Sequence, residues 1–202
     1  MPTAMRIVLA SNNAGKIKEL NHILPQSFEL LPAKQFELES PEETGTTFVE
    51  NAIIKARYAC QETGLSAIAD DSGLEVDALN GAPGVYSSRF AGPESTDQDN
   101  NSKLLKDLSE TTMRSARFRC VIVFMRTATD PMPIIAMGTW EGEISRQPKG
   151  GNGFGYDPIF FLPALGITAA DMNKAEKNSV SHRGQAIRSL QTQMATLLAH
   201  NN

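Results

Sequence analysis

The sequence predicts an α/β fold in which a long mixed β-sheet carries flanking helices. In the first half of the chain, short apolar runs alternate with stretches of helical periodicity, a pattern typical of parallel strands joined by helices. In the second half, two apolar runs at 116–126 and 133–145 follow each other closely, as in an antiparallel pair. The 202 residues are 41% hydrophobic and 21% charged, which is enough to bury a core, so we expect residues 1–202 to form a single domain.

The first elements follow from apolar runs and the residues that flank them. A strand is expected over 6–10 ("RIVLA"), and a helix over 15–24, where isoleucine and leucine recur on one side and Pro25 ends the pattern. Residues 26–38 are expected to hold a second strand and a loop.

The clearest helix is predicted over 46–63. Thr47 and Glu50 have the spacing of a capping box, and Gly64 supplies a C-terminal stop. Small alanines give this helix a stripe that can approach a sheet closely. A short buried strand over 66–69 follows it.

Turn and capping residues divide the middle of the chain. The alternation in "GLEVDAL" (73–79) predicts a further extended segment, and "NGAPG" (80–84) predicts a turn. Thr96 is expected to begin a short helix that runs through Leu108.

The last third of the chain contains one more strand and two more helices. The strand is expected over 157–163, Thr168 and Asp171 predict the cap of a short helix, and Ser181 begins the final helix. The residues of this helix that we expect to face the core are Ile187, Leu190, Met194, Leu197 and Leu198.

Charge and cysteine content exclude several classes of protein. Nineteen basic and 23 acidic residues give a net charge of −4, whereas a general nucleic-acid binder carries a basic surplus, so no nucleic-acid partner is expected. Cys60 and Cys120 are far apart and are expected to be buried thiols in a reducing compartment rather than zinc ligands. No apolar run is long enough for a signal peptide or a membrane span, which predicts a cytoplasmic protein without a membrane partner.

The segment from Ser11 to Lys16 ("SNNAGK") joins the first strand to the first helix. Backbone N–H groups at the start of a helix bind anions, Gly15 allows a close approach, and Lys16 adds a positive charge. The segment is not a P-loop, because Ala10 and Ile17 stand where that motif needs Gly and Ser or Thr. Ordinary capping at a strand–helix junction is the alternative interpretation.

Two adjacent acids, Asp70 and Asp71, follow the strand at 66–69, where open α/β sheets bind ligands. Two carboxylates about 4 Å apart repel each other by several kcal/mol at an effective dielectric constant of ~20, and a divalent cation reverses the sign. Oxygen-only ligation predicts Mg²⁺ rather than zinc. Glu42 and Glu43 precede the capped helix, where acids also favour the helix dipole.

A glycine-rich loop, "GGNGFGYDP" (150–158), carries two aromatic residues. The glycines let the loop wrap around a ligand, while Phe154 and Tyr156 offer faces for a flat ring. The alternative is a flexible hairpin whose aromatic side chains pack on the core.

Three basic residues, Lys177, His182 and Arg183, gather near the predicted start of the last helix. Positive charge at a helix N-terminus opposes the helix dipole, so their presence needs another reason. A bound anion or carbonyl acceptor would supply it.

Taken together, five segments resemble the inosine triphosphate pyrophosphatases, also called XTP/dITP diphosphatases. They are "SNNAGK", "PEETGTTFVENAIIKA", "ADDSGLEVDALNGAPGVYSSRFAG", "GGNGFGYDPIFF" and "KNSVSHRGQA". The resemblance implies Mg²⁺-dependent hydrolysis of a non-canonical purine nucleoside triphosphate (ITP, dITP or XTP) to its monophosphate and pyrophosphate, which cleanses the nucleotide pool. It also implies a homodimer and a fold of two lobes around an active-site cleft.

The resemblance further assigns roles to individual residues. Asp71 would be the catalytic acid–base residue and a metal ligand, with Glu42 as a second metal ligand. The substrate-binding residues it implies are Ser11, Asn12, Asn13, Ala14, Gly15 and Lys16 on the triphosphate, Ser72 in contact with substrate, Phe154, Gly155, Tyr156 and Asp157 around the base and sugar, and Lys177, His182 and Arg183 on the base side.

Specificity is expected to depend on the base. Hypoxanthine and xanthine carry a 6-oxo acceptor to which Arg183 or protonated His182 can donate, whereas adenine would place donor against donor. Three other functions stay open at this point: a pyrophosphatase for other modified nucleotides, a non-catalytic nucleotide sensor, and a structural interaction protein. The first would not need the basic cluster, and the second would lack a water-activating acid such as Asp71.

Overall fold

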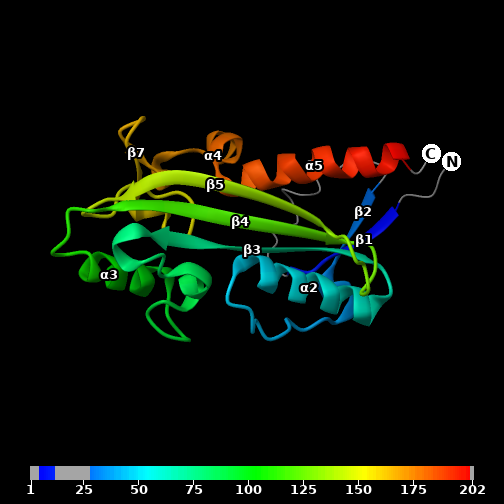
Figure 1. Cartoon of the computed structure of the whole chain (residues 1–202). Coiled ribbons are helices and arrows are strands. Elements are labelled where there is room, and N and C mark those ends of the chain that lie inside the picture. Colours follow the sequence, from blue (N-terminus) through cyan, green and yellow to red (C-terminus); the bar gives the residue numbers. More distant parts are fainter. Residues whose placement is uncertain (1–4, 12–27, 201–202) are drawn as a thin grey trace. The chain divides into compact units, whose positions relative to one another are not determined.

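The computed structural model describes residues 5–11 and 28–200, with side chains through residue 196 (Figure 1). Within them, seven strands form one sheet in the order β2-β1-β3-β4-β5-β6-β7. The strands are β1 (Met5–Leu9), β2 (Phe28–Pro32), β3 (Ser66–Val76), β4 (Ser115–Met125), β5 (Ile134–Ile144), β6 (Phe160–Leu162) and β7 (Ile167–Thr168). The α-helices are α2 (Phe48–Thr63), α3 (Asp97–Asp107), α4 (Lys174–Val180) and α5 (His182–His200). The predicted α/β class is confirmed.

The sheet is mixed, as predicted. β1 pairs in parallel with β2, with Met5 opposite Phe28, and in parallel with β3, with Ile7 opposite Ser66. β6 pairs antiparallel with both β5 and β7. The parallel pairs come from the part of the sequence where strands alternate with helices, because parallel strands need long crossover connections such as α2.

The chain forms two compact units. Unit 1 comprises Met1–Asp71, Cys120–Met137 and Ala186–Asn202, and unit 2 comprises Ser72–Arg119 and Gly138–Gln185. The predicted arrangement of two lobes around a cleft stays a prediction. Among the helices that the structure describes, none combines the length and apolar character needed to cross a bilayer.

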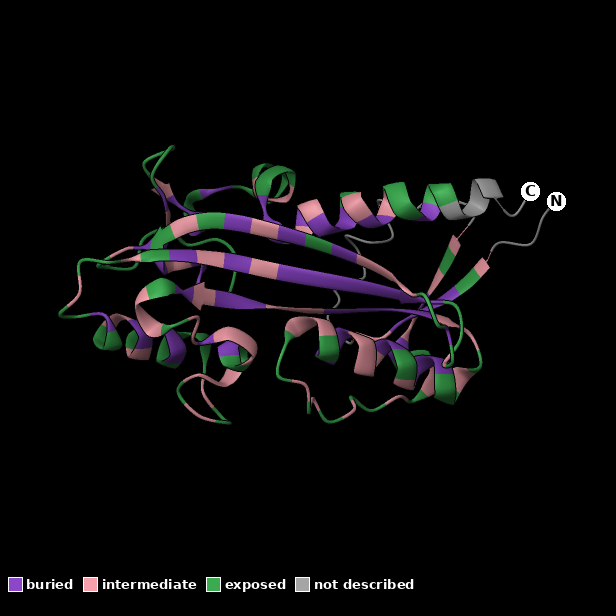
Figure 2. Cartoon of the chain, in the orientation of Figure 1, coloured by how far each residue is buried: buried purple, intermediate pink, exposed green. Residues whose placement is uncertain are grey.

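The core of unit 1 has two apolar clusters that follow the alternation of the strands. Ile7 and Ile122 belong to the cluster that includes α5, whereas their neighbours Val8 and Val123 belong to the one that includes α2. Successive residues of a strand point to opposite faces, so helices cover both faces of the sheet here. In Figure 2 the residues of β4 from Cys120 to Met125 form a continuous buried run, as expected for a strand covered on both sides.

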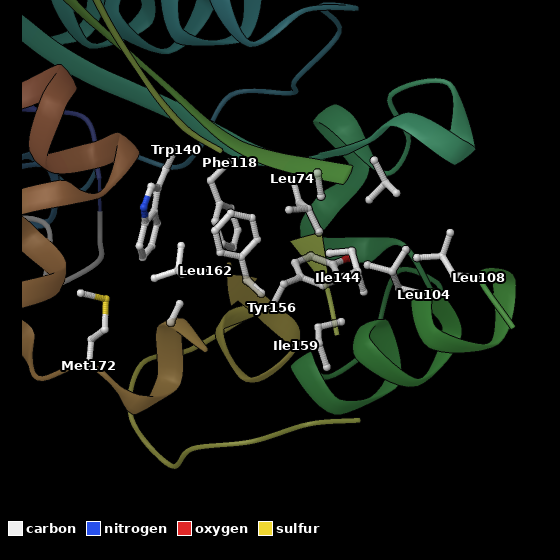
Figure 3. Packing of buried hydrophobic residues seen from close by; sticks show 14 residues of the cluster. Leu74, Leu104, Leu108, Phe118, Trp140, Ile144, Tyr156, Ile159, Leu162 and Met172 are labelled. Carbon is white, nitrogen blue, oxygen red and sulfur yellow. The ribbon is translucent and has the colours of Figure 1, made fainter. Parts of the chain in front are cut away.

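The core of unit 2 is a single cluster rich in aromatic rings (Figure 3). Phe118 and Phe160 lie with ring centroids 4.5 Å apart, and Trp140 lies 5.2 Å from Phe160. Leu104 from α3 and Tyr156 from the glycine-rich loop complete the cluster. Burying rings of this size gives unit 2 a rigid base for the surface residues described below.

The local predictions at helix ends are confirmed. Thr47 is the N-cap of α2 and forms a capping box with Glu50, and Gly64 ends the helix in the left-handed conformation with φ of 66°. Thr96 caps α3, and α3 ends before Leu108. The helix predicted over 15–24 lies outside the described residues.

Three predictions about the elements are corrected. The strand expected at 66–69 and residues 73–76 of the segment expected at 73–79 form one strand, β3, because its pairing in the sheet overrides the weak β-propensity of Asp-Asp-Ser-Gly. Residues 77–79 form a 3₁₀ turn instead of extended chain. Residues 157–159 of the predicted strand 157–163 form a 3₁₀ turn, since Pro158 lacks the N–H that a central strand requires. The helix α4 was missed, although Asn173 and Glu176 form its capping box.

Candidate active site

Asp70 and Asp71 belong to unit 1 and lie within β3, not at its end, so the predicted position at a strand terminus is wrong. The neighbouring strand β1 does end beside them: Leu9 lies opposite Ile68, and the N–H of Ala10 donates to the carbonyl oxygen of Ile68 at 2.8 Å. The acids therefore follow the carboxyl end of the parallel pair. This is the edge at which open α/β sheets bind ligands.

Lys55 of α2 joins the acids into a cluster. Its Nζ lies 2.9 Å from Asp71 Oδ1 and 3.1 Å from Glu43 Oε1. The side chains of Lys55 and Asp71 are each only 13% exposed, so the ion pair is shielded from most of the solvent. The ammonium favours the charged form of the carboxylate and so opposes the effect of its partial burial.

Asn51 lies one helical turn before Lys55 and is fully buried. Its Oδ1 accepts the N–H of Gly45 at 2.8 Å, and its Nδ2 lies 3.5 Å from Asp71 Oδ2. Residues four apart share one face of a helix, so α2 directs both polar side chains towards Asp71. Lys55 therefore holds one carboxylate oxygen of Asp71, and among the described residues the other oxygen has a single long contact, with Asn51.

The environment of Asp71 makes this carboxylate a better proton acceptor than an ordinary aspartate. Burial raises its pKa, and the Lys55 ammonium offsets part of that rise. Glu43 and Asp70 raise the pKa further. Burial alone would lower the pKa of Lys55, but the surrounding carboxylates, chiefly Asp71, raise it above its ordinary value. A carboxylate whose pKa is raised by a specific environment is a candidate for acid–base chemistry.

Of the two consecutive glutamates before α2, Glu43 contacts Lys55 and Glu42 is exposed. The role of Glu42 as a metal ligand stays a prediction. Among the residues that the structure describes, no three or more His, Cys, Asp or Glu side chains are already gathered as a metal site.

Ser11 is the one predicted triphosphate-binding residue that the structure describes. Its N–H donates to the carbonyl oxygen of Leu9, and it lines a small cavity of about 20 Å³ together with Lys55. The other predicted residues of this loop, Asn12, Asn13, Ala14, Gly15 and Lys16, lie outside the described residues.

Unit 2 contains a cavity of about 150 Å³. All eight predicted substrate-binding residues of this unit line it: Ser72, Phe154, Gly155, Tyr156, Asp157, Lys177, His182 and Arg183. Sites for whole drug-sized ligands are usually ~300–1,000 Å³, so this cavity suits a single ring system. Its first residue, Ser72, directly follows Asp71 in the chain.

The glycine-rich loop presents Phe154 on two glycines with left-handed backbone. Gly153 has φ of +78° and Gly155 has φ of +61°, and the residue between them, Phe154, is 58% exposed. The buried carboxylate of Asp157 accepts the N–H of Phe154 at 3.0 Å and also contacts the Lys177 ammonium. A Cβ on Gly153 would lie 2.0 Å from Asp157 Oδ2, so only glycine fits there.

Two cations face the exposed ring. Lys177 Nζ lies 5.1 Å and Arg183 Cζ 5.8 Å from the ring centroid of Phe154. Arg183 Nη2 donates to Ser72 Oγ at 3.3 Å, which directs the guanidinium along the cavity wall. An aromatic face with cations beside it suits a flat ring that carries oxygen acceptors.

Two buried rings form the rest of the wall. The hydroxyl of Tyr156 donates to the carbonyl oxygen of Ser87 at 2.8 Å, and burial raises the pKa of this tyrosine, so it stays protonated. His182 stacks on Phe118 with centroids 4.8 Å apart and an interplanar angle of 14°. Tyr156 is thus part of the cavity wall, and Phe154 is the exposed platform.

The three predicted basic residues come from two helices. His182 and Arg183 open α5, as predicted, but Lys177 lies in the last turn of α4. A positive charge there favours the helix dipole, so the expectation that Lys177 opposes it is wrong.

A model of the Ham1 family matches residues 7–193. The chain belongs to the Ham1 family.

Relatives within the Ham1 family are similar over nearly the whole chain. A dITP/XTP pyrophosphatase from Thioalkalivibrio sulfidiphilus is 56% identical over 189 residues, which cover 92% of this chain and 96% of that protein. A dITP/XTP pyrophosphatase from Idiomarina loihiensis is 54% identical over 196 residues, covering 94% and 97%. The structure of a HAM1 protein from Coxiella burnetii superimposes with a TM-score of 0.93 at 51% identity and covers 95% of this chain and 99% of that one.

Sequence reasoning missed several residues of the candidate site of this Ham1-family chain. Lys55 and Asn51 carried a signal, since they are polar residues four apart in a helix whose neighbouring positions are alanine. Ser87, Asp97 and Phe118 also line the cavity of unit 2. Ser87 follows a predicted turn, Asp97 lies in a predicted surface helix and Phe118 lies in a predicted core strand. Their local sequence pattern gives no sign of a ligand-binding role.

Proposed function

We propose that this chain hydrolyses non-canonical purine nucleoside triphosphates (ITP, dITP and XTP) to the nucleoside monophosphate and pyrophosphate, which cleanses the nucleotide pool. The observation that carries the proposal is Asp71, a shielded carboxylate with a raised pKa that Lys55 holds by one oxygen. The relatives named dITP/XTP pyrophosphatase support the choice of substrate.

In the proposed reaction, Asp71 orients a water molecule and accepts its proton. The water oxygen attacks the α-phosphorus, the P–O bond to the bridging oxygen between the α- and β-phosphorus breaks, and pyrophosphate leaves with that oxygen. Lys55 and Lys16 supply positive charge that offsets the repulsion between the polyanionic substrate and the attacking oxygen.

The carboxylates of unit 1 fit a hard divalent cation. Glu43 and Asp71 converge on one cationic group, the Lys55 ammonium, and they offer the oxygen ligands that Mg²⁺ prefers. We assign Mg²⁺ to Asp71 and to Glu42, the exposed neighbour of Glu43 that the resemblance implies as a ligand, with the remaining ligands from substrate and water. Bound there, Mg²⁺ would neutralise charge on the leaving pyrophosphate.

The cavity of unit 2 is assigned to the base. The base would stack on Phe154, and the donors of Arg183 and His182 would face its 6-oxo group. The 6-amino group of adenine would leave these buried donors unpaired, at ~1–3 kcal/mol per group. We therefore expect a much higher kcat/KM for ITP and XTP than for ATP.

The deciding experiment is a panel of nucleoside triphosphates with Mg²⁺, assayed separately for phosphate and pyrophosphate. Pyrophosphate from ITP and XTP, lost in Asp71→Asn, is expected. Phosphate as the first product would mean cleavage at the γ-position and a different enzyme. A nucleotide sensor, the alternative from another class, would bind ITP without releasing either product.

The homodimer belongs to the same proposal and rests on the resemblance, whereas the cytoplasmic location is proposed from the sequence, in which no apolar run is long enough for a signal peptide or a membrane span. Sedimentation equilibrium that returns the mass of one chain would reject the dimer.

A further inference from the structure

Two side chains of α3, Asp97 and Asn101, hold the peptide that follows Phe154. Asp97 Oδ2 accepts the N–H of Gly155 at 2.6 Å, and Asn101 Nδ2 donates to the carbonyl oxygen of Gly155 at 3.0 Å. Residues four apart lie on one face of a helix, so the two side chains reach the loop together. We call this pair the α3 clamp.

The helix that carries the α3 clamp is itself firmly fixed. Thr96 and Asp99 form the capping box at its N-terminus. The side chain of Asn100 donates to the carbonyl oxygen of Ser88 and accepts the N–H of Ala91. Leu104 is fully buried in the aromatic cluster (Figure 3). The α3 clamp therefore transmits the position of a well-packed helix to the loop.

Phe154 depends on hydrogen bonds of the loop for its position. Its ring is more than half exposed, and the flanking glycines allow the backbone many conformations. On the N-terminal side, Asp157 accepts the N–H of Phe154. On the C-terminal side, the α3 clamp occupies both backbone polar groups of Gly155.

We propose that Asp97 and Asn101 are positioning residues that set the orientation of Phe154, and through it the affinity of the cavity for the base. The inference rests on the proposed function, because it takes Phe154 as the platform on which the base stacks. The α3 clamp has no role in the hydrolytic step, so its loss changes KM and leaves kcat nearly unchanged.

The test uses Asp97→Ala and Asn101→Asp, with Asp99→Ala as the matched control. Asn101→Asp keeps the shape of the side chain but sets a carboxylate against the Gly155 carbonyl. Asp99→Ala removes a carboxylate from the same turn, but the Asp99 carboxylate accepts its hydrogen bonds from the N–H and hydroxyl of Thr96 at the helix cap rather than from Gly155. We expect KM for ITP to rise about tenfold in both clamp variants, as loss of one base–aromatic stack would give, and to stay within twofold in the control.

Two further readouts separate positioning from general damage. The affinity for tripolyphosphate, which has no base, should be unchanged in the clamp variants. In a Phe154→Leu background, Asp97→Ala should raise KM no further, because the residue through which it acts is gone. An additive effect in this double variant, or a weakened tripolyphosphate affinity, overturns the proposal.

Hydrogen exchange of residues 150–157 tests the α3 clamp without substrate. The Gly155 N–H should lose protection in Asp97→Ala and keep it in Asp99→Ala. A wild-type protein that releases no pyrophosphate from ITP, while the Gly155 N–H still loses protection in Asp97→Ala alone, would reject the proposed function and support the α3 clamp. Unchanged exchange in Asp97→Ala rejects the clamp itself.

Discussion

Lys55→Met is expected to shift the pH dependence of hydrolysis as well as to reduce its rate. Lys55 Nζ lies 2.9 Å from Asp71 Oδ1, and two unit charges at this distance attract each other by ~6 kcal/mol at an effective dielectric constant of ~20. Loss of hydration offsets much of this attraction. The Lys55 ammonium lowers the pKa of the Asp71 carboxyl, so we expect removal of the lysine charge to raise that pKa further above its ordinary value.

The direction of the effect follows from the role of Asp71. As a general base, Asp71 works only when deprotonated, and burial already raises its pKa above the ordinary value. Activity should therefore fall on the acid side at a higher pH than an ordinary aspartate would give. Lys55→Met moves this acid limb of the kcat/KM profile to still higher pH, and at the plateau the loss of a charge beside the substrate costs ~10²-fold.

Lys103→Met is the matched control for this change. Lys103 pairs with Asp107 on α3, and its side chain is 39% exposed. The control should keep both the plateau and the acid limb of the wild-type protein. An acid limb that stays in place in Lys55→Met, whatever its rate, would refute the assignment of Asp71 as the base.

Two predictions concern the stability and the loop. The side chain of Asp130 is 1% exposed and accepts hydrogen bonds from Arg126, which keep the pKa of this carboxyl well below its ordinary value. Asp130→Asn should therefore lower the free energy of unfolding by ~2 kcal/mol at pH 7. Because the pKa is lower in the folded state, this stabilisation is present above pH ~4 and is lost as the pH falls below it, so urea unfolding at pH 3 should show a smaller difference between wild type and variant. Gly153→Ala should displace the Asp157 carboxylate and raise KM for ITP about tenfold. Gly151→Ala is the control and should leave KM unchanged, because a Cβ on Gly151 would meet no atom within 4 Å. Equal KM values for the two variants would contradict the steric argument.

The sequence predicted best the features that residues close together in the chain determine, such as helix ends. Capping boxes such as Thr47 with Glu50 lie within four residues, so their signal survives without knowledge of the fold. β3 shows the opposite case, because Asp-Asp-Ser-Gly disfavours a strand locally and only pairing with distant strands makes it one.

The same distinction explains what could be predicted of the candidate site. Eight of the residues that line the cavity of unit 2 were predicted through motifs that keep Phe154 and Asp157, or His182 and Arg183, close in sequence. Lys55 was missed because its partner Asp71 is 16 residues away, on another element. Its burial depends on how α2 packs on the sheet, and a lysine in an amphipathic helix is typical of a solvated face.

The two units each contain an aspartate that is shielded from most of the solvent and pairs with a lysine, and the difference between the two aspartates supports the choice of base. Asp157 is only 2% exposed, and its carboxylate already holds the Phe154 N–H and Lys177, so this pair fixes the loop. Asp71 keeps 13% of its side chain exposed, and within the part of the chain that the structure describes its Oδ2 has one long contact, at 3.5 Å, with Asn51. A general base needs an oxygen that a water molecule can reach. Of these two aspartates, Asp71 alone meets that condition, because the lysine that holds it binds the other oxygen.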